Sequence, residues 1–88
     1  MIKFRQYYQR NGAVIVYQYE RIRDLREDAD LTQRDVAGVL NITPQQYSLY
    51  ERGDREIPLH HAIVLARYYN VSLDYLAGLT NTKRKLKG

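Results

Sequence analysis

The fold of this chain is determined mainly by residues 31–53, which have the sequence LTQRDVAGVLNITPQQYSLYERG. Two threonines eleven positions apart, Thr32 and Thr43, each precede a helix-forming stretch and are suited to cap it. Each is followed three positions later by a side chain that can bond back to the backbone of the cap, Asp35 in one case and Gln46 in the other. The stretch therefore predicts two short helices in close succession.

A hydrophobic staple accompanies each of these helix starts. The two pairs are Leu31 with Val36, and Ile42 with Tyr47. Asn41 stands where a left-handed residue is needed, and asparagine tolerates that conformation better than most residues. Pro44 suits the first helical position because the N–H that proline lacks would have no partner there. Only residues 41–43 then connect the two helices, which predicts a helix-turn-helix arrangement.

Helices are also expected on both sides of this pair. A helix over about residues 18–28 is indicated by apolar residues spaced for one face, namely Ile22, Leu25 and Ala29. Residues 58–70 are expected to form a longer helix whose inward-facing residues are Leu59, Ala62, Ile63, Ala66 and Tyr69. Ser72 is expected to cap a short last helix that ends at Gly78. The whole pattern predicts an all-α domain.

The first 18 residues allow three interpretations. Asn11-Gly12 lies between two segments rich in β-branched or aromatic residues, which is a hairpin signal. A disordered arm and an extension of the first helix fit the composition about as well. The chain is therefore expected to comprise an N-terminal extension (residues 1–18), a helical domain (19–80) and a basic tail (81–88).

Composition narrows the class of protein. Apolar residues make up 44% of the chain, which is typical of a globular domain. The chain has no cysteine, which excludes disulfides and thiolate metal sites and suits a reducing compartment. No secretory signal is evident near the start, and the longest apolar run there, residues 13–17, is too short to cross a bilayer. We expect a soluble cytoplasmic protein with no membrane contact.

The net charge of +4 is unevenly distributed. Residues 1–18 and 79–88 contain three and four basic residues, respectively, and no acid. Residues 19–78 contain 7 arginines and all 10 acids, a balance of −3. A basic protein suggests a polyanionic partner, although basic ends can equally serve solubility alone.

The second helix of the pair carries the candidate base contacts. Tyr47 and Tyr50, three positions apart, are expected to anchor it to the core. The opposite face then presents Pro44, Gln45, Ser48, Leu49 and Arg52. Gln45 can bond bidentately to adenine, Ser48 to a base edge or phosphate, and Leu49 can contact a thymine methyl. Gln46 can share in base contact, although capping competes for its amide. The alternative is an ordinary solvated face.

Contacts to the DNA phosphates are expected beside this helix. Thr32 and Gln33 begin the preceding helix, whose free N–H groups suit an anion. Thr43, Arg52 and Arg55 are further candidates for phosphate contact. For Arg55 the alternative is a surface ion pair with Asp54 or Glu56.

Enzymatic and metal-binding functions find little support. His60 and His61 are adjacent on a helix, so they point about 100° apart and cannot share a metal as an i, i+4 pair can. The tyrosines at 68, 69 and 75 are better explained by the core or a dimer contact than by base stacking. No glycine-rich phosphate loop, paired carboxylates or activated nucleophile is evident, so no catalytic residue, cofactor or metal is expected.

Several motifs in order resemble the Cro/C1-type (Xre) helix-turn-helix family. They are Leu31-Thr32-Gln33-Arg34-Asp35-Val36-Ala37, Ile42-Thr43-Pro44, Tyr50-Glu51-Arg52-Gly53 and Asn70-Val71-Ser72-Leu73-Asp74-Tyr75-Leu76-Ala77-Gly78. The resemblance covers about residues 19–80. It implies a compact five-helix lambda-repressor-like fold, a bacterial or phage-encoded protein at the nucleoid, and transcriptional repression by a homodimer on double-stranded DNA.

The same resemblance assigns residues to roles. Gln33 matches a phosphate-binding glutamine, and Pro44, Gln45, Ser48 and Leu49 match base-facing positions. Arg26 and Glu51 match a structural ion pair between the first and third helices. The chain departs from the pattern at Pro44 and Leu49, where hydrogen-bonding residues are common.

A protein-interaction function is the alternative from another class. An antitoxin or adaptor with a protein partner such as a toxin would fit the acidic middle and the unmatched N-terminal segment. RNA binding through the basic ends lacks the signature of an RNA-binding module. For a homodimer, the first expected contact is the last helix with Tyr75, Leu76 and Leu79, and the second is the N-terminal segment.

Overall fold

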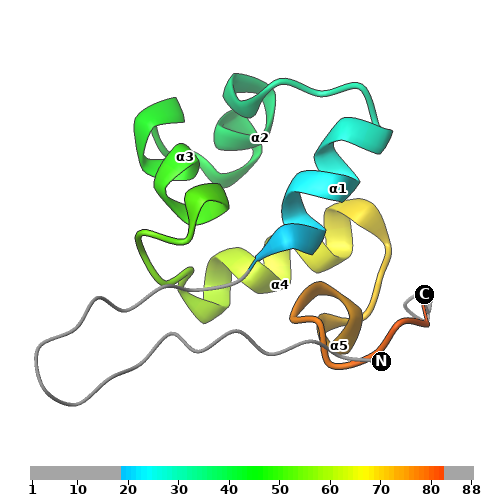
Figure 1. The fold of residues 1–88 in the computed structure, drawn as a ribbon. Helices are drawn as coiled ribbons and strands as arrows, with labels where there is room; N and C mark the ends of the chain where they lie inside the picture. Colours follow the sequence, from blue (N-terminus) through cyan, green and yellow to red (C-terminus); the bar gives the residue numbers. More distant parts are fainter. Residues whose placement is uncertain (1–18, 83–88) are drawn as a thin grey trace, which may run out of the picture.

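The structure, a computed structural model, describes residues 19–82, and within them it contains five α-helices and no strand (Figure 1). The helices are α1 (Glu20–Asp28), α2 (Gln33–Leu40), α3 (Pro44–Arg52), α4 (Leu59–Tyr69) and α5 (Leu73–Leu76). The predicted all-α class and five-helix arrangement are therefore confirmed. The hairpin or arm expected over residues 1–18 lies outside the described residues.

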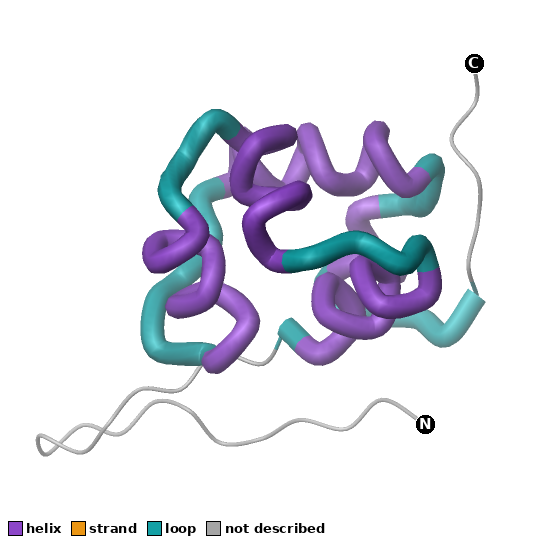
Figure 2. Tube along the Cα trace, turned by 90° about the horizontal axis from the view of Figure 1, so that it is seen from above, coloured by secondary structure: helices purple, strands orange, loops and turns teal. Residues whose placement is uncertain are grey.

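The helices enclose one core, and short loops join them on its outside (Figure 2). Helix α3 packs against α2 and α1, and α5 packs against α4 and α1. Figure 1 shows α2 and α3 together at one end of the domain and α5 at the opposite end. The helix-turn-helix pair therefore has an outer surface that the other helices do not cover.

The predicted capping boxes fix the starts of α2 and α3. The Thr32 hydroxyl accepts from the Asp35 N–H at 3.0 Å, and the Asp35 carboxylate accepts from the Thr32 N–H at 2.9 Å. Thr43 and Gln46 repeat the arrangement, with distances of 3.1 and 3.0 Å. Asn41 between the helices is left-handed at φ 60°, as predicted. Local side-chain chemistry thus sets the angle at which α3 leaves α2.

The core consists of eleven buried side chains contributed by all five helices and Val71. They are Ile22, Leu25, Val36, Ala37, Leu40, Tyr47, Tyr50, Leu65, Ala66, Val71 and Leu76. Tyr47 and Tyr50 anchor α3 as predicted, with exposed fractions of 0% and 6%. Because both tyrosines point inward, the opposite side of α3 is left to solvent.

Two predictions about the core were wrong, and one core residue was missed. Leu59, expected to face inward, is 69% exposed, whereas Leu65, which was not expected there, is fully buried. The inward face of α4 runs through 62, 65, 66 and 69, which is i, i+3, i+4, i+7 spacing, and Leu59 lies in the first turn at the edge of that face. Ala29, expected on the inner face of α1, is exposed at its C-terminus.

Leu76 was expected as a dimer contact, but it is 4% exposed and belongs to the core. Its neighbour Tyr75 packs against the core with the Arg21 guanidinium 4.1 Å above its ring. Arg21 also donates to the carbonyls of Tyr75 and Thr80 at 3.2 and 3.1 Å, and to Asn81 at 2.6 Å. One arginine thus attaches the start of α1 to the end of the domain, a link that sequence analysis missed.

A buried carboxylate joins α1, α2 and α3. Glu51 on α3 accepts from Arg26 on α1 at 2.7 and 3.1 Å, from Gln33 on α2 at 3.0 Å, and from the Tyr47 hydroxyl at 2.6 Å. The Glu51 side chain is 4% exposed and that of Arg26 14%. Arg26 also donates to the Leu31 carbonyl at 2.9 Å, which ties the loop before α2 to the same group. The pair implied by the family resemblance is therefore in contact and well shielded.

The ionisation of this cluster favours the charged carboxylate. Burial alone would raise the pKa of Glu51, but the hydrogen bonds from Arg26, Tyr47 and Gln33 together outweigh burial and hold that pKa below its usual value. Burial, followed by the bond to Glu51, raises the pKa of the Tyr47 hydroxyl far above its usual value. Tyr47 therefore remains a donor, and Glu51 remains an anion near neutral pH.

We predict that Glu51→Gln lowers the free energy of unfolding by about 3 kcal/mol, because it leaves the shielded Arg26 guanidinium without its counter-charge. Urea denaturation near neutral pH and at low temperature measures the change. Asp54→Asn is the matched control, since its pair with Arg52 is exposed and should contribute at most about 1 kcal/mol. Equal losses in the two variants would contradict a structural role for the Glu51 cluster.

We also predict acid sensitivity from the same carboxylate. A pKa lowered by folding stabilises the protein above the unfolded pKa, and this stability is lost as pH falls below 4.5, the ordinary value for Glu51. The free energy of unfolding should therefore fall between about pH 6 and pH 3, and less steeply in Glu51→Gln than in the wild type. Some slope should persist because hydrogen bonds at the α2 cap also lower the pKa of Asp35. Parallel slopes in the two proteins would show that Glu51 does not titrate with folding.

Candidate DNA interface

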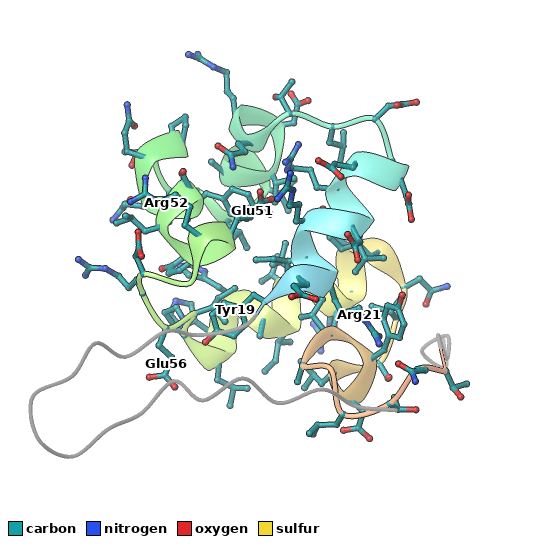
Figure 3. All side chains as sticks on the ribbon, in the orientation of Figure 1. Tyr19, Arg21, Glu51, Arg52 and Glu56 are labelled. Carbon is teal, nitrogen blue, oxygen red and sulfur yellow. The ribbon has the colours of Figure 1, made fainter. Side chains whose placement is uncertain are left out.

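The outward side of α3 presents a stripe of four residues, Gln45, Ser48, Leu49 and Arg52, at i, i+3, i+4, i+7 spacing. Gln45 and Arg52 are exposed, while Ser48 and Leu49 are half-buried. Figure 3 shows Arg52 on the outer side of α3 and Glu51 between α3 and α1. This stripe, called the α3 stripe below, is the surface that sequence analysis assigned to base contact.

The two adjacent glutamines of α3 have different surroundings. The Gln46 side-chain oxygen accepts from the Thr43 N–H, and the Thr43 hydroxyl is 3.3 Å from the same oxygen. The Gln45 side chain takes part in no hydrogen bond among residues 19–82. The donors and the acceptor of the Gln45 amide are therefore available to a ligand. The side-chain oxygen of Gln46, in contrast, already accepts a hydrogen bond at the helix cap.

Pro44 and Thr43 lie at the N-terminal end of the same helix. Pro44 occupies the first helical position and is half-buried. The Thr43 hydroxyl accepts from the Gln46 N–H, so it contributes to the start of the helix before any ligand is present. A contact between the Thr43 hydroxyl and a phosphate would have to form while the hydroxyl still accepts this hydrogen bond.

Gln33, at the start of α2, is held by the Glu51 cluster. One amide hydrogen goes to the Glu51 carboxylate at 3.0 Å, and a glutamine amide carries two. The second hydrogen is available to an acceptor in front of the α2 N-terminus, where helical N–H groups also favour an anion. Thr32 is exposed there, with its hydroxyl accepting from the Asp35 N–H.

A polar pocket of about 390 Å³ lies between α1, α2 and α3. Its lining residues are Arg23, Arg26, Gln33, Glu51 and Arg52. The lining contains three guanidinium groups, and each is paired with a carboxylate: Arg23 with Glu27 at 3.3 Å, Arg26 with Glu51 at 2.7 Å, and Arg52 with Asp54. Arg52 belongs both to this pocket and to the α3 stripe, so the two surfaces are continuous. Sequence analysis missed Arg23, which nothing in its local pattern distinguishes from other exposed helical arginines.

The ion pairs in the loop after α3 differ from the pair of Arg55 with Asp54 or Glu56 that sequence analysis gave as the alternative to phosphate contact. Asp54 pairs with Arg52 rather than with Arg55, and the Arg52 Nε donates to it at 2.9 Å. Both side chains of that pair are about half exposed or more, at 61% and 49%, so solvent and ions can compete for it. Arg55 is exposed.

The two histidines form no metal-binding group with other residues of the described chain. No group of three or more His, Cys, Asp or Glu residues suited to a metal occurs within residues 19–82. The His60 and His61 rings lie 4.1 Å apart, and His61 also faces the Tyr50 ring at 6.1 Å. Burial, with a smaller effect of His60, lowers the pKa of His61, so packing accounts for this pair. None of the helices within residues 19–82 has the length and apolar character needed to span a membrane.

The amino-acid sequence of this chain is similar to the sequences of known helix-turn-helix proteins. The family model described as Helix-turn-helix (HTH_3) matches residues 22–76. The uncharacterized HTH-type transcriptional regulator YobD of Bacillus subtilis (strain 168) is 39% identical over 62 residues, which is 70% of this chain and 55% of YobD. The HTH-type transcriptional regulator ImmR of the same organism is 36% identical over 66 residues, 75% of this chain and 52% of ImmR.

A phage protein is similar as well. The cryptic phage CTXphi transcriptional repressor RstR of Vibrio cholerae is 36% identical over 69 residues, 76% of this chain and 62% of RstR. The chain thus spans between about half and three-fifths of the length of these curated relatives. No solved structure gives a significant match.

The matched residues 22–76 include the cap, turn and buried faces of the α2–α3 pair and all eleven buried core residues. They exceed half of the 88-residue chain. The family is one of DNA-binding regulators and not of enzymes. The chain therefore belongs to the Cro/C1-type helix-turn-helix family of transcriptional regulators.

Proposed function

We propose that this protein is a sequence-specific double-stranded DNA-binding transcriptional regulator that acts as a repressor and binds as a homodimer. The observation that carries the proposal is the continuity of the α3 stripe with the arginine-lined pocket through Arg52, whose ion pair with Asp54 is exposed and open to exchange for a phosphate. Base edges and backbone phosphates lie side by side in a major groove, so a protein that binds there needs adjoining surfaces of these two kinds. The site of action is the cytoplasm, at the nucleoid.

Base contact centres on the N-terminal half of the α3 stripe. Gln45 donates to and accepts from an adenine edge, since its amide is exposed and otherwise unengaged. Ser48 bonds to a base edge or phosphate, and Leu49 and Pro44 offer apolar contact to thymine methyl groups. Gln46 contributes less because its acceptor oxygen caps the helix.

Phosphate contact positions the domain from both sides of that stripe. Gln33 donates its second amide hydrogen, oriented by Glu51, and Thr32 and the α2 N-terminus add donors beside it. Arg52 exchanges its exposed partner Asp54 for a phosphate. Arg55 and Thr43 lie close in sequence to the two ends of α3 and complete the set. These contacts fix the register of α3 without specifying sequence.

A homodimer would supply the specificity that one α3 lacks. Within the stripe of one copy, two polar side chains, Gln45 and Ser48, are available for hydrogen bonds to bases. Two copies on a two-fold site place a second reading helix about 34 Å away, one helical turn along the DNA. The similarity to RstR, a cryptic phage transcriptional repressor, supports repression as the outcome.

Selection of bound fragments from genomic DNA, followed by footprinting, tests the function. We expect a two-fold site protected by a complex of two chains, with an affinity that falls steeply as salt rises. Absence of any footprint, together with salt-independent association, would refute DNA binding. A footprint of a single half-site would refute the homodimer and leave DNA binding intact.

We predict that Gln45→Ala weakens binding to the selected site by about 1 to 3 kcal/mol and relaxes preference at one base position. The neighbouring Gln46→Ala is the comparison variant, because it removes a capping acceptor; it should lower stability by about 1 kcal/mol and change base preference less than Gln45→Ala does. Competition with a library of single-base variants of the site measures both effects. A uniform loss over all sequences in Gln45→Ala would make Gln45 a positioning residue.

Salt dependence should separate charged from neutral phosphate contacts. Arg55→Gln should reduce the slope of log affinity against log salt by about 0.9, because one phosphate is no longer neutralised. Gln33→Ala should weaken binding to all sequences but leave that slope unchanged, since glutamine carries no charge. Arg67→Gln on α4 is the control for loss of an exposed arginine elsewhere. If the slope measured for Arg55→Gln equals that of the Arg67→Gln control, Arg55 does not contact a DNA phosphate.

A further inference from the structure

An apolar groove of about 200 Å³ lies on the side of the domain formed by the start of α1, the start of α4, and α5. Its edges include three leucines with large exposed fractions: Leu59 at 69%, Leu73 at 38% and Leu79 at 54%. Its other lining residues include Tyr19, Ile57 and Asp74. Apolar side chains gathered in one place on a small domain indicate a surface that another element covers.

The size and chemistry of the groove favour aliphatic side chains over a small molecule. Small-molecule sites usually measure roughly 300 to 1,000 Å³ and place several polar groups around the ligand. This groove is smaller, and Asp74 is the charged residue in its lining. A short run of valine or isoleucine side chains matches both features.

The chain enters the described structure at this groove. Tyr19, the first described residue, lines it, and its hydroxyl accepts from the Ile57 N–H at 3.2 Å. The sequence just before it, separated by Gln18 alone, is Ala13-Val14-Ile15-Val16-Tyr17, which contains five apolar residues in succession. The most apolar run outside the described residues is therefore tethered two positions from a residue of the groove.

We propose that residues 13–17 of the same chain occupy this groove and cover its leucines. Attachment through Gln18 makes the association intramolecular, at an effective concentration in the millimolar range that a separate partner must exceed. This segment would then belong to the fold of this chain, although it lies outside the residues matched by the family model. The inference concerns the surface opposite the α2–α3 end and does not depend on DNA binding.

Charge also favours this occupant. Asp74 lines the groove, and Glu56 precedes the residue that bonds to Tyr19, at the same edge of the domain (Figure 3). The first 18 residues contain basic residues and no acid, the basic ones being Lys3, Arg5 and Arg10. An apolar run preceded by positive charge is complementary to an apolar groove with carboxylates beside it.

The other segment outside the described residues is a poorer fit. Residues 83–88 contain one apolar side chain larger than glycine, Leu86, among four basic residues. A single leucine cannot cover three exposed ones, and the neighbouring charges would lose hydration in an apolar groove. The N-terminal run is the better candidate within this chain.

Disulfide trapping tests the proposal cleanly because the full chain contains no cysteine. Leu59→Cys is combined in turn with a cysteine at each of positions 13 to 17, and oxidation is followed on non-reducing gels with dilution. We expect at least one pair to form a cross-link within the monomer. The matched control pairs the same positions with Arg34→Cys, an exposed site on α2.

Two results would overturn the proposal. Cross-links that appear only between two chains would assign the groove to a second copy. Cross-linking to Leu59→Cys that is no faster than to Arg34→Cys would show that the segment does not visit the groove selectively.

Polar substitutions in the segment give an independent test. In Ile15→Asp and in Val14→Asp/Val16→Asp, the methyl signals of Leu59, Leu73 and Leu79 should shift, while that of Leu40 in the core should not. The unfolding equilibrium constant should rise by roughly tenfold or more, as expected for removal of a buried aliphatic side chain. Ile2→Asp, outside the run, is the matched control. Circular dichroism establishes that the variants keep their helices, and unchanged methyl signals and unchanged stability in helical variants would refute the proposal.

Discussion

The carboxylate of Glu51 receives hydrogen bonds from three helices, and the geometry of the α2–α3 surface depends on them. A charge with a 4% exposed side chain is tolerated only when its oxygens are satisfied, and here Arg26, Tyr47 and Gln33 provide the donors. Each donor comes from a different turn or helix, so none can move without leaving a buried partner unsatisfied. The cluster therefore fixes the rotation of α3 and the position of the α2 N-terminus together.

This arrangement divides α3 into two sides with separate tasks. Tyr47, Tyr50 and Glu51 hold the helix to the domain, and the α3 stripe remains for a ligand. Gln33 connects the two tasks, because the same amide that bonds to Glu51 has a second hydrogen directed to a phosphate in our proposal. A rigid inner side is what allows apolar outer residues such as Leu49 to meet bases in a fixed register.

The opposite end of the domain is organised by one arginine and by apolar contact. Helix α5 is only four residues long, and Arg21 attaches the chain around it to α1 through two carbonyls and the Tyr75 ring. So short a helix has little stability of its own and depends on what packs against it. Cover for Leu73 and Leu79 by the N-terminal run would extend the core over this end.

The sequence by itself determined the elements whose causes are local. The capping boxes at Thr32 and Thr43 and the left-handed Asn41 rest on interactions within about four residues, so the motif carries them wherever it occurs. The helical spacing of Tyr47 and Tyr50 indicated the inner face of α3 in the same way. The order of these motifs also sufficed to identify the family and to name the α3 stripe.

Tertiary structure alone decided what depends on the distance between helices. It placed Leu65 rather than Leu59 in the core, buried Leu76, linked Arg21 to the end of the domain and added Arg23 to the arginine-lined pocket. Helical periodicity predicts which residues of a helix face inward only to within about one position. The rotation of the helix about its own axis depends on how closely the neighbouring helices pack against it. The partner of a long polar side chain is likewise set by helices brought together across many residues, as with Gln33 and Glu51, 18 positions apart.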